Sequence, residues 1–489
     1  MIFNSIQFLV FFVLVTTLYY VLPYRYRWPM LLAASCWFYM AFVPVYILIL
    51  AFTIVVDYGA GILIEGSTGR TRKRWLTASI IANVGVLAIF KYYGFLTDNW
   101  EALVHSFGYA DYSVPDLGII LPIGLSFHTF QSLSYTIEVY RGNQKAERHL
   151  GIFSLYVMFY PQLVAGPIER PDNLLRQLHL KFDFDPKVVA SGMKLMAWGF
   201  FKKLVIADRV SAMVNHVYDS PQAHEGPALL LATLLFSIQI YCDFSGYSDI
   251  ALGAARTLGI DLMRNFRTPY YSTNISEFWR RWHISLSSWF RDYVYISLGG
   301  NRVVKWRWYY NLIITFLLSG LWHGANWTYI VWGGLHGFYL VFAVVTADMR
   351  GKLGAALGLG KLPWLNMAIQ TATTFCLVAF AWIFFRADTV SNAWYIATHL
   401  FTGLGGFFTG DALTFWAPLV GSSANEMYVA LLGIAIMELV QQLHNRRAMT
   451  LRMAEWSAVK RYAIYMGLIA FCVFLGSYYH TAQFIYFQF

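Results

Sequence analysis

Long runs of apolar residues, separated by short polar loops, dominate the pattern of this 489-residue sequence. A helix that crosses a membrane needs roughly 20 consecutive apolar residues, and about eleven segments satisfy that rule. Alternating segments typical of a membrane β-barrel do not stand out. The pattern therefore predicts an all-α, polytopic integral membrane protein. Between residues 150 and 301 the polar positions are irregular, and we expect re-entrant or amphipathic helices there.

Charge in the loops predicts how these helices are oriented. Short cytoplasmic loops carry an excess of Lys and Arg. Residues 70–74, 302–307 and 446–461 are basic, whereas residues 388–426 contain no Lys or Arg. The alternation predicts a multi-pass protein with both termini on the extracytoplasmic side. Pro44 interrupts a long apolar stretch and predicts a break between two helices.

Composition narrows the class of protein further. The chain is 58% hydrophobic and only 13% charged, whereas soluble domains are near 25% charged. The four cysteines are scattered and form no metal-binding spacing, so neither a disulfide scaffold nor a zinc site is expected. The net charge of +10 fits basic cytoplasmic loops, and we expect no nucleic-acid partner.

Ionisable residues inside apolar segments are costly and by default mark function. One stretch, residues 239–301, contains Asp243, Arg280, Arg281 and His283 among many aromatic residues. A helix is expected to start near residue 276, with Thr273 or Ser276 as its cap. Each arginine has two interpretations: a side chain that snorkels to the membrane interface, or one that pairs with an acid or a phosphate.

A second stretch, LLSGLWHGAN at residues 317–326, contains His323 between Gly320 and Gly324. Glycines on both sides allow backbone or substrate to approach closely. A buried imidazole stays neutral and can act as a general base. The alternative is a structural histidine bonded to a helix carbonyl, and this alternative is stronger for His336, nearer the middle of its helix.

Four long stretches contain distinctive motifs. They are PQLVAGPIERP (161–171), YCDFSGYSDIALG (241–253), EFWRRWHISLSSWFRDYVYISLGGNR (277–302) and LSGLWHGANWTYIVWGGLHG (318–337). Together these stretches resemble the membrane-bound O-acyltransferase superfamily. Within it they are most similar to the bacterial branch that O-acetylates exported polysaccharides, and the resemblance extends over nearly the whole chain.

The resemblance implies one membrane-embedded domain over residues 1–489, with its catalytic core in 239–345 around a central tunnel. His323 matches the family's histidine in the WHG context, and His283 matches the second family position. Both are expected to be catalytic. Further candidates for binding the donor or the acceptor are Arg280, Arg281, Trp322, Asn326 and Asp243.

The resemblance also implies a reaction. A cytoplasmic thioester, acetyl-CoA, is expected to supply an acetyl group for O-acetylation of an exported polysaccharide such as alginate, with no bound cofactor or metal. An extracytoplasmic SGNH-type acetyltransferase is the expected partner. Alternatives within the family are peptidoglycan O-acetylation and D-alanylation of teichoic acid from an acyl carrier protein. Outside it, a transporter or channel, or a non-catalytic scaffold, stays open.

The last residues, 480–489, form a predicted extracytoplasmic aromatic tail that ends in FIYFQF. Its Tyr486 has two interpretations. The residue either belongs to an aromatic belt at the membrane interface, or relays the acyl group as a tyrosyl ester. The second interpretation follows the resemblance, since related D-alanylation systems carry a similar terminal motif on a small separate subunit.

Overall fold

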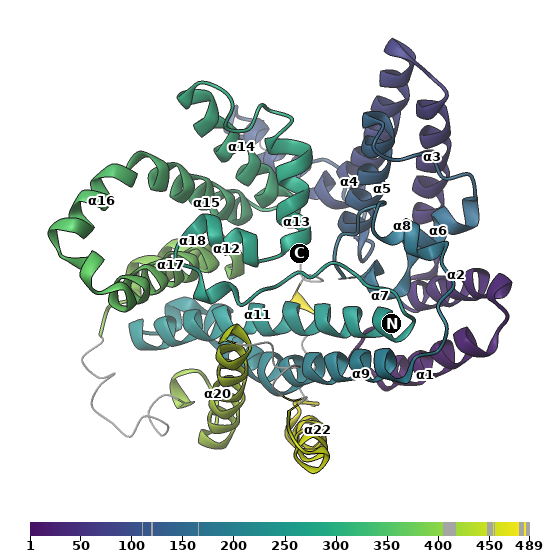
Figure 1. Cartoon of the computed structure of the whole chain (residues 1–489). Helices are drawn as coiled ribbons and strands as arrows, with labels where there is room; N and C mark the ends of the chain where they lie inside the picture. The colour runs from purple at the N-terminus through teal and green to yellow at the C-terminus, as the bar shows by residue number, and fades with distance from the viewer. Residues whose placement is uncertain are drawn as a thin grey trace. The chain divides into compact units, whose positions relative to one another are not determined.

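The protein is helical (Figure 1), and no strand occurs in the part of the chain that the computed structural model describes. This confirms the all-α prediction. The helices fall into two compact units: residues 1–196 with 250–263, and residues 197–249 with 264–489. The described residues are 1–109, 111–118, 121–164, 166–403, 417–446, 453, 455–478 and 484–485.

The first unit contains the N-terminal helices. Pro44 breaks the chain as predicted, because α2 ends at Met40 and a short 3₁₀ turn precedes α3. The helices that lie within this unit are α1 (Ile6–Val21), α2 (Tyr24–Met40), η1 (Pro44–Tyr46), α3 (Ile47–Glu65), α4 (Gly69–Ser106), α5 (Leu125–Arg141), α6 (Leu150–Met158), α7 (Tyr160–Leu163) and α8 (Leu174–Leu178).

Close packing of α3, α4 and α5 forms the centre of the first unit. Gly61 lets α5 approach α3, because a Cβ at that position would lie 2.5 Å from the hydroxyl oxygen of Tyr135. The buried carboxylate of Asp57 accepts hydrogen bonds from Ser79 and Asn83, at 2.7 and 2.9 Å. Neutral donors therefore solvate this carboxylate inside the helix bundle.

The second unit contains most of the conspicuous motifs. Two helices, α9 (Pro186–Phe200) and α11 (Gly226–Thr257), run through both units. The other longer elements are η2 (Phe201–Ala207, a π-helix), α10 (Asp208–Tyr218), α12 (Ile275–Arg281), α13 (Ile284–Trp289), η5 (Phe290–Tyr295, a π-helix), α14 (Lys305–His323), α15 (Trp327–Val345), α16 (Ala347–Ala356), α17 (Pro363–Arg386), α18 (Val390–His399), α20 (Ala424–Arg446) and α22 (Ala458–Leu475).

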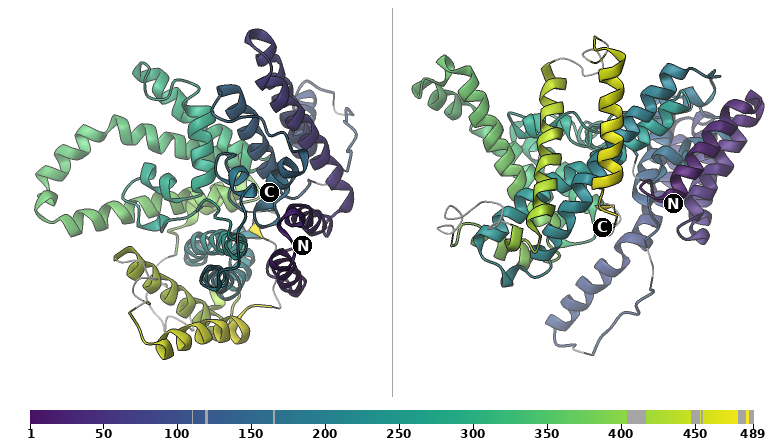
Figure 2. Two further views of the ribbon diagram at one scale, coloured as in Figure 1. Left: turned by 45° about the vertical axis from the view of Figure 1, so that its right-hand side comes forward. Right: turned by 90° about the horizontal axis from the view of Figure 1, so that it is seen from below.

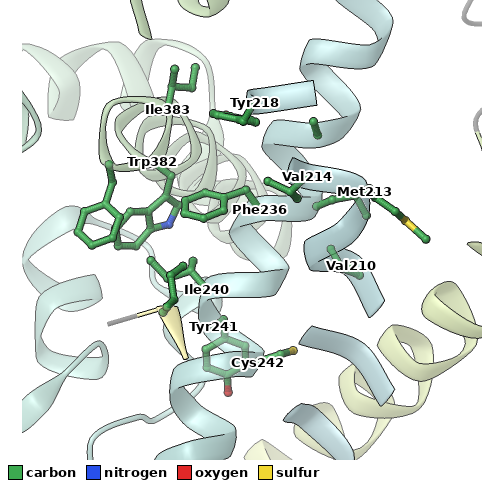
Figure 3. Packing of buried hydrophobic residues seen from close by; sticks show 14 of the residues in the cluster. Val210, Met213, Val214, Tyr218, Phe236, Ile240, Tyr241, Cys242, Trp382 and Ile383 are labelled. Carbon is green, nitrogen blue, oxygen red and sulfur yellow. The ribbon is translucent and has the colours of Figure 1, made fainter. Parts of the chain in front are cut away.

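Apolar side chains of α10, α11 and α17 pack together in the second unit, as Figure 3 shows. Phe236 and Trp382 are at most 1% exposed, and Val214 is fully buried. Because lipid tails are as apolar as these side chains, close van der Waals packing is the main favourable contribution to the association of these helices. Helices α20 and α22, yellow-green and yellow in Figure 2, both pack against η2.

Seven helices of the described chain are long and apolar enough to cross a membrane. They confirm a multi-pass membrane protein, whereas the prediction of about eleven spans stays a prediction. Helix α14, which has Lys305 and Arg307 in its first turn, is not one of the seven. The seven are residues 44–65, 69–106, 226–257, 327–345, 363–386, 424–445 and 458–475.

Candidate active site

Two glycines bring α14 and α15 into backbone contact and so fix the end of α14. A Cβ on Gly333 would overlap the carbonyl oxygen of Phe316 and lie 3.1 Å from its carbonyl carbon. A Cβ on Gly320 would overlap the carbonyl oxygen of Tyr329 in the same way. Glycine is required at both positions because the two helix backbones touch there.

His323 is the last residue of α14, less than one turn after Gly320. Its ring is 4% exposed, and its Nδ1 lies 2.6 Å from the carbonyl oxygen of Ser319. A carbonyl can only accept, so Nδ1 carries the proton and the lone pair of the neutral ring is on Nε2. The bond to a helix carbonyl is the contact expected of a structural histidine, but it also gives the ring the tautomer that a general base needs.

His283 lies between the short helices α12 and α13 and is fully buried. Its backbone adopts φ 43° and ψ 55°, the left-handed conformation that non-glycine residues rarely take. Asn265 holds this turn, because its carbonyl oxygen accepts the N–H of Ile284 at 2.9 Å and its side chain accepts the Ser285 hydroxyl at 2.7 Å. Strained residues that the surroundings hold in place concentrate at functional sites.

Aromatic rings connect the two histidines. The Trp322 ring lies 6.2 Å from that of His283 and 5.0 Å from that of His323, between ring centres. Trp332 of α15 packs on the other side, 4.8 Å from the His323 ring. The second unit thus brings both predicted catalytic residues, and the predicted Trp322, into one aromatic cluster.

The prediction of the cap of α12 is wrong. Asn274, not Thr273 or Ser276, is the N-cap, and its side-chain oxygen accepts the N–H of Glu277 at 2.8 Å. Glu277 in turn accepts the N–H and hydroxyl of Thr273, at 2.8 and 2.7 Å. Asn, Ser and Thr are all good caps, so the sequence alone did not rank them.

Arg280 and Arg281 lie on α12. Arg281 pairs with Glu277, with 2.6 Å between Nη2 and Oε1. Burial by itself would raise the pKa of Glu277, but the bonds from Thr273 and the charge of Arg281 outweigh it and lower that pKa. The exposed Arg280 donates to the Ser276 hydroxyl at 3.1 Å. No described contact connects either arginine to the histidine cluster.

Asn326 begins α15. Its side-chain oxygen accepts the N–H of Thr328 at 3.0 Å, and its amide donates to the carbonyl oxygen of Asp388 at 3.0 Å. Both bonds stabilise the loop that directly follows His323. The described contacts of Asn326 are therefore those of a helix cap.

Asp243 belongs to a buried ion cluster that the sequence reasoning did not identify as a whole. Lys203 lies between Asp208 and Asp243, with its Nζ 2.7 and 2.8 Å from their oxygens. All three side chains are at most 3% exposed. The signal was present in the sequence, because the run KKLVIADR at residues 202–209 places charges beside an apolar segment.

Tyr486 lies outside the described residues, but Phe484 and Ile485 of the same tail are described and buried, at 2% and 1% exposure. The N–H of Ile485 donates to Oδ2 of Asp243 at 2.8 Å. Phe484 stacks on Tyr247, with 4.3 Å between ring centres and 29° between planes. These two residues therefore pack into the second unit.

Comparison with known proteins agrees with these motifs. Residues 149–353 match the model of MBOAT, the membrane-bound O-acyltransferase family. A probable alginate O-acetylase of Azotobacter vinelandii is 41% identical over 405 residues, which are 82% of this chain and 78% of the relative.

Two further relatives differ in length and in named activity. A probable alginate O-acetylase of Pseudomonas putida is 35% identical over 510 aligned positions that span all of both chains. A peptidoglycan O-acetyltransferase of Helicobacter pylori is 35% identical over 390 residues, 74% of this chain and 71% of the relative. The similarity therefore extends well beyond the histidine motifs.

Proposed function

The chain belongs to the membrane-bound O-acyltransferase family, and we propose that it acetylates an exported cell-surface polysaccharide of the alginate type. The proposed donor is acetyl-CoA on the cytoplasmic side of a bacterial inner membrane. The names of the relatives support the acetyl group and a polymeric acceptor. A transporter or a non-catalytic scaffold does not fit a member of an acyltransferase family.

The tautomer of His323 is the observation that carries the proposal. With Nδ1 bonded to the carbonyl of Ser319, Nε2 can take the proton of an attacking hydroxyl. The hydroxyl oxygen then forms a bond to the thioester carbonyl carbon, the carbon–sulfur bond breaks, and the proton passes to the departing thiolate. A positioned general base contributes about 10² to 10⁴ in rate.

His283 is proposed to support the same step. It is fully buried beside His323 and Trp322, and its left-handed backbone is held by Asn265. A second imidazole that contacts the same Trp322 ring can orient the reacting carbonyl group or the attacking hydroxyl. The small exposure of His323 means that both substrates must travel through the protein interior, and the tunnel implied by the family resemblance remains part of the proposal.

Tyr486 is the proposed first acceptor. Its hydroxyl would lose its proton to His323 and form an aryl ester with the acetyl group, and an extracytoplasmic SGNH-type partner would then take the acetyl group from that ester. The burial of Phe484 and Ile485 in the second unit supports this order of events. In this proposal both termini lie outside the cytoplasm, and Arg280 and Arg281 are candidates for contacts to the phosphates of the donor.

Replacement of His323 by Gln tests the proposal. We expect loss of acetyl groups from the exported polysaccharide, measured by mass spectrometry, with the protein still folded in the membrane. Ser319→Ala is the matched control, because it keeps the backbone carbonyl that bonds Nδ1 and should keep activity. Full acetylation by His323→Gln would overturn the proposal.

Replacement of Tyr486 by Phe tests the relay separately. This change keeps an aromatic ring and removes only the hydroxyl, so an aromatic anchor would survive it. We expect acetylation to be lost, and unchanged acetylation would exclude the relay while leaving the role of His323 intact.

The acceptor has one specific alternative. The peptidoglycan O-acetyltransferase of Helicobacter pylori covers most of this chain, so peptidoglycan is the second candidate polymer. Mass spectrometry of both cell-wall fragments and secreted glycan from cells lacking the protein distinguishes the two. The same spectra identify the transferred group, acetyl or D-alanyl, by its mass.

A further inference from the structure

In the buried ion cluster, the two carboxylate oxygens of Asp243 have different partners. Oδ1 of Asp243 lies 2.8 Å from Nζ of Lys203, whereas Oδ2 accepts the N–H of Ile485 at 2.8 Å. Lys203 also lies 2.7 Å from Asp208. Since a buried charge is tolerated only when it is paired and hydrogen-bonded, the ion pair with Lys203 and the hydrogen bond from the tail together satisfy the Asp243 carboxylate.

Phe484 and Ile485 contact one face of α11. Tyr247 is four residues after Asp243 and three residues after Phe244, and both spacings make side chains neighbours on a helix surface. Phe484 stacks on Tyr247 and meets Phe244 at 5.9 Å between ring centres. The Phe244 ring also lies 4.6 Å from the His283 ring. A single aromatic ring thus separates the docked tail from the histidine cluster.

The π-helix η2 holds the chain that precedes the tail as well. The carbonyl oxygen of Leu204 accepts the N–H of Ser477 at 2.9 Å, just after α22 ends. Arg209 donates to the carbonyl oxygen of Leu475 at 2.7 Å. Lys203 and Leu204 belong to the same π-helix, so one irregular segment anchors both the end of α22 and, through Asp243, residues 484–485. Such segments are frequent at functional sites.

We propose that Asp243, held by Lys203, is a positioning residue for acetyl transfer, because it docks Phe484 and Ile485 of the tail one aromatic ring away from the histidine cluster. The inference rests on the proposed function, because the docked segment matters for the reaction only if the tail receives the acetyl group. It adds to that function a docking site for the tail, here called the dock, which consists of Asp243, Phe244 and Tyr247.

Two pairs of variants test the dock. Asp243→Asn removes the charge that accepts the tail, and Asp249→Asn is its matched control on the same helix, because Asp249 pairs with Lys202 at 2.8 Å. Ile485→Pro removes the N–H donor, although it also restricts the backbone of residues 484 and 485, and it changes no residue of the ion cluster. Ile485→Val keeps that donor. A merely structural role of the ion pairs predicts similar behaviour of Asp243→Asn and Asp249→Asn.

The first measurement is photo-cross-linking of the full chain in membranes, with p-azidophenylalanine in place of Phe484. Mass spectrometry measures the yield of cross-link to the α11 peptide around Tyr247. Loss of a hydrogen bond to a charged group should lower this yield about ten-fold in Asp243→Asn and Ile485→Pro. Asp249→Asn and Ile485→Val should retain it. An unchanged yield in Asp243→Asn, or an equal loss in Asp249→Asn, overturns the dock.

The second measurement is acetyl transfer to the polysaccharide by the same variants without the photoprobe. Misplaced reacting groups should lower kcat about 10²-fold in Asp243→Asn and Ile485→Pro, with the KM for acetyl-CoA unchanged. Full acetylation despite a lost cross-link would refute positioning and leave the proposed function standing. Full acetylation by His323→Gln, in contrast, would refute the proposed function whatever the cross-link shows.

Discussion

Replacement of Gly333 by Ala tests whether the contact between α14 and α15 positions His323. The added methyl carbon would overlap the carbonyl oxygen of Phe316 and lie 3.1 Å from its carbonyl carbon and 3.3 Å from Cα of Gly320. Carbon atoms in contact are normally about 3.5 to 4.0 Å apart. The obstructing atoms are backbone, so relief requires that the two helices separate by about 1 Å near Gly320.

The size of the effect follows from this displacement. Gly320 is three residues before His323, so a shift of about 1 Å there moves the imidazole by a similar amount, and such misplacement can lower a rate about 10²-fold. Overpacking costs about 1 to 3 kcal/mol of stability, and the better helix propensity of Ala offsets about 1 kcal/mol. We therefore expect a large loss of activity with a small net loss of stability.

The assay is acetyl transfer together with thermal unfolding of the detergent-solubilised protein. Gly334→Ala is the matched control, because a Cβ there meets only Leu317 Cδ2, at 3.7 Å. It should keep activity and gain slightly in stability through helix propensity. Normal activity in Gly333→Ala, or an equal loss in Gly334→Ala, would refute the reasoning about His323.

Three further changes have expected outcomes. Lys203→Met leaves two buried carboxylates without their cation and should destabilise the protein by about 3 to 5 kcal/mol. Adding Asp208→Asn and Asp243→Asn should restore most of the lost stability in unfolding measurements. Absence of such recovery would contradict the ion-pair account. Asn274→Ala should lower the free energy of unfolding by about 1 kcal/mol through loss of the cap, whereas Ser276→Ala should leave it nearly unchanged. Equal melting temperatures of the two variants would speak against Asn274 as the cap. The pKa of Glu277 is lowered in the folded protein. The ionised side chain therefore stabilises the fold above its unfolded pKa of about 4.3, and this stabilisation is lost as pH falls through the folded pKa. We expect Glu277→Gln to be less stable than the unchanged protein at pH 7 and equally stable near pH 3. The difference should be below about 1 kcal/mol, since the ion pair is partly exposed.

Much of this protein follows from its sequence. Hydropathy predicts the class, because backbone polar groups in lipid are satisfied only in helices or closed barrels, and the long apolar runs of this chain are typical of helices. The break at Pro44 follows from the geometry of proline, and α2 and α3 indeed lie on either side of it. The prediction of His323 and His283 came from sequence motifs, and the structure brings both residues into one cluster around Trp322.

Local pattern alone was less decisive where several residues had similar propensities. Asn274, Thr273 and Ser276 are all competent caps, and the choice depends on a backbone angle and a reciprocal bond with Glu277. Likewise Gly320 and Gly324 indicated close approach without indicating what approaches. The structure identifies Tyr329 of α15 at both positions.

The sequence by itself determined a helical membrane protein and its family, and it predicted His323 and His283 as candidate catalytic residues. Hydropathy and motifs are properties of neighbouring residues and do not depend on the fold. Only the tertiary structure decided that Asp243 meets Lys203 and the N–H of Ile485, a residue 242 positions away. A hydrogen bond depends on distance and direction in space, and no periodicity along the chain encodes a contact between segments so far apart.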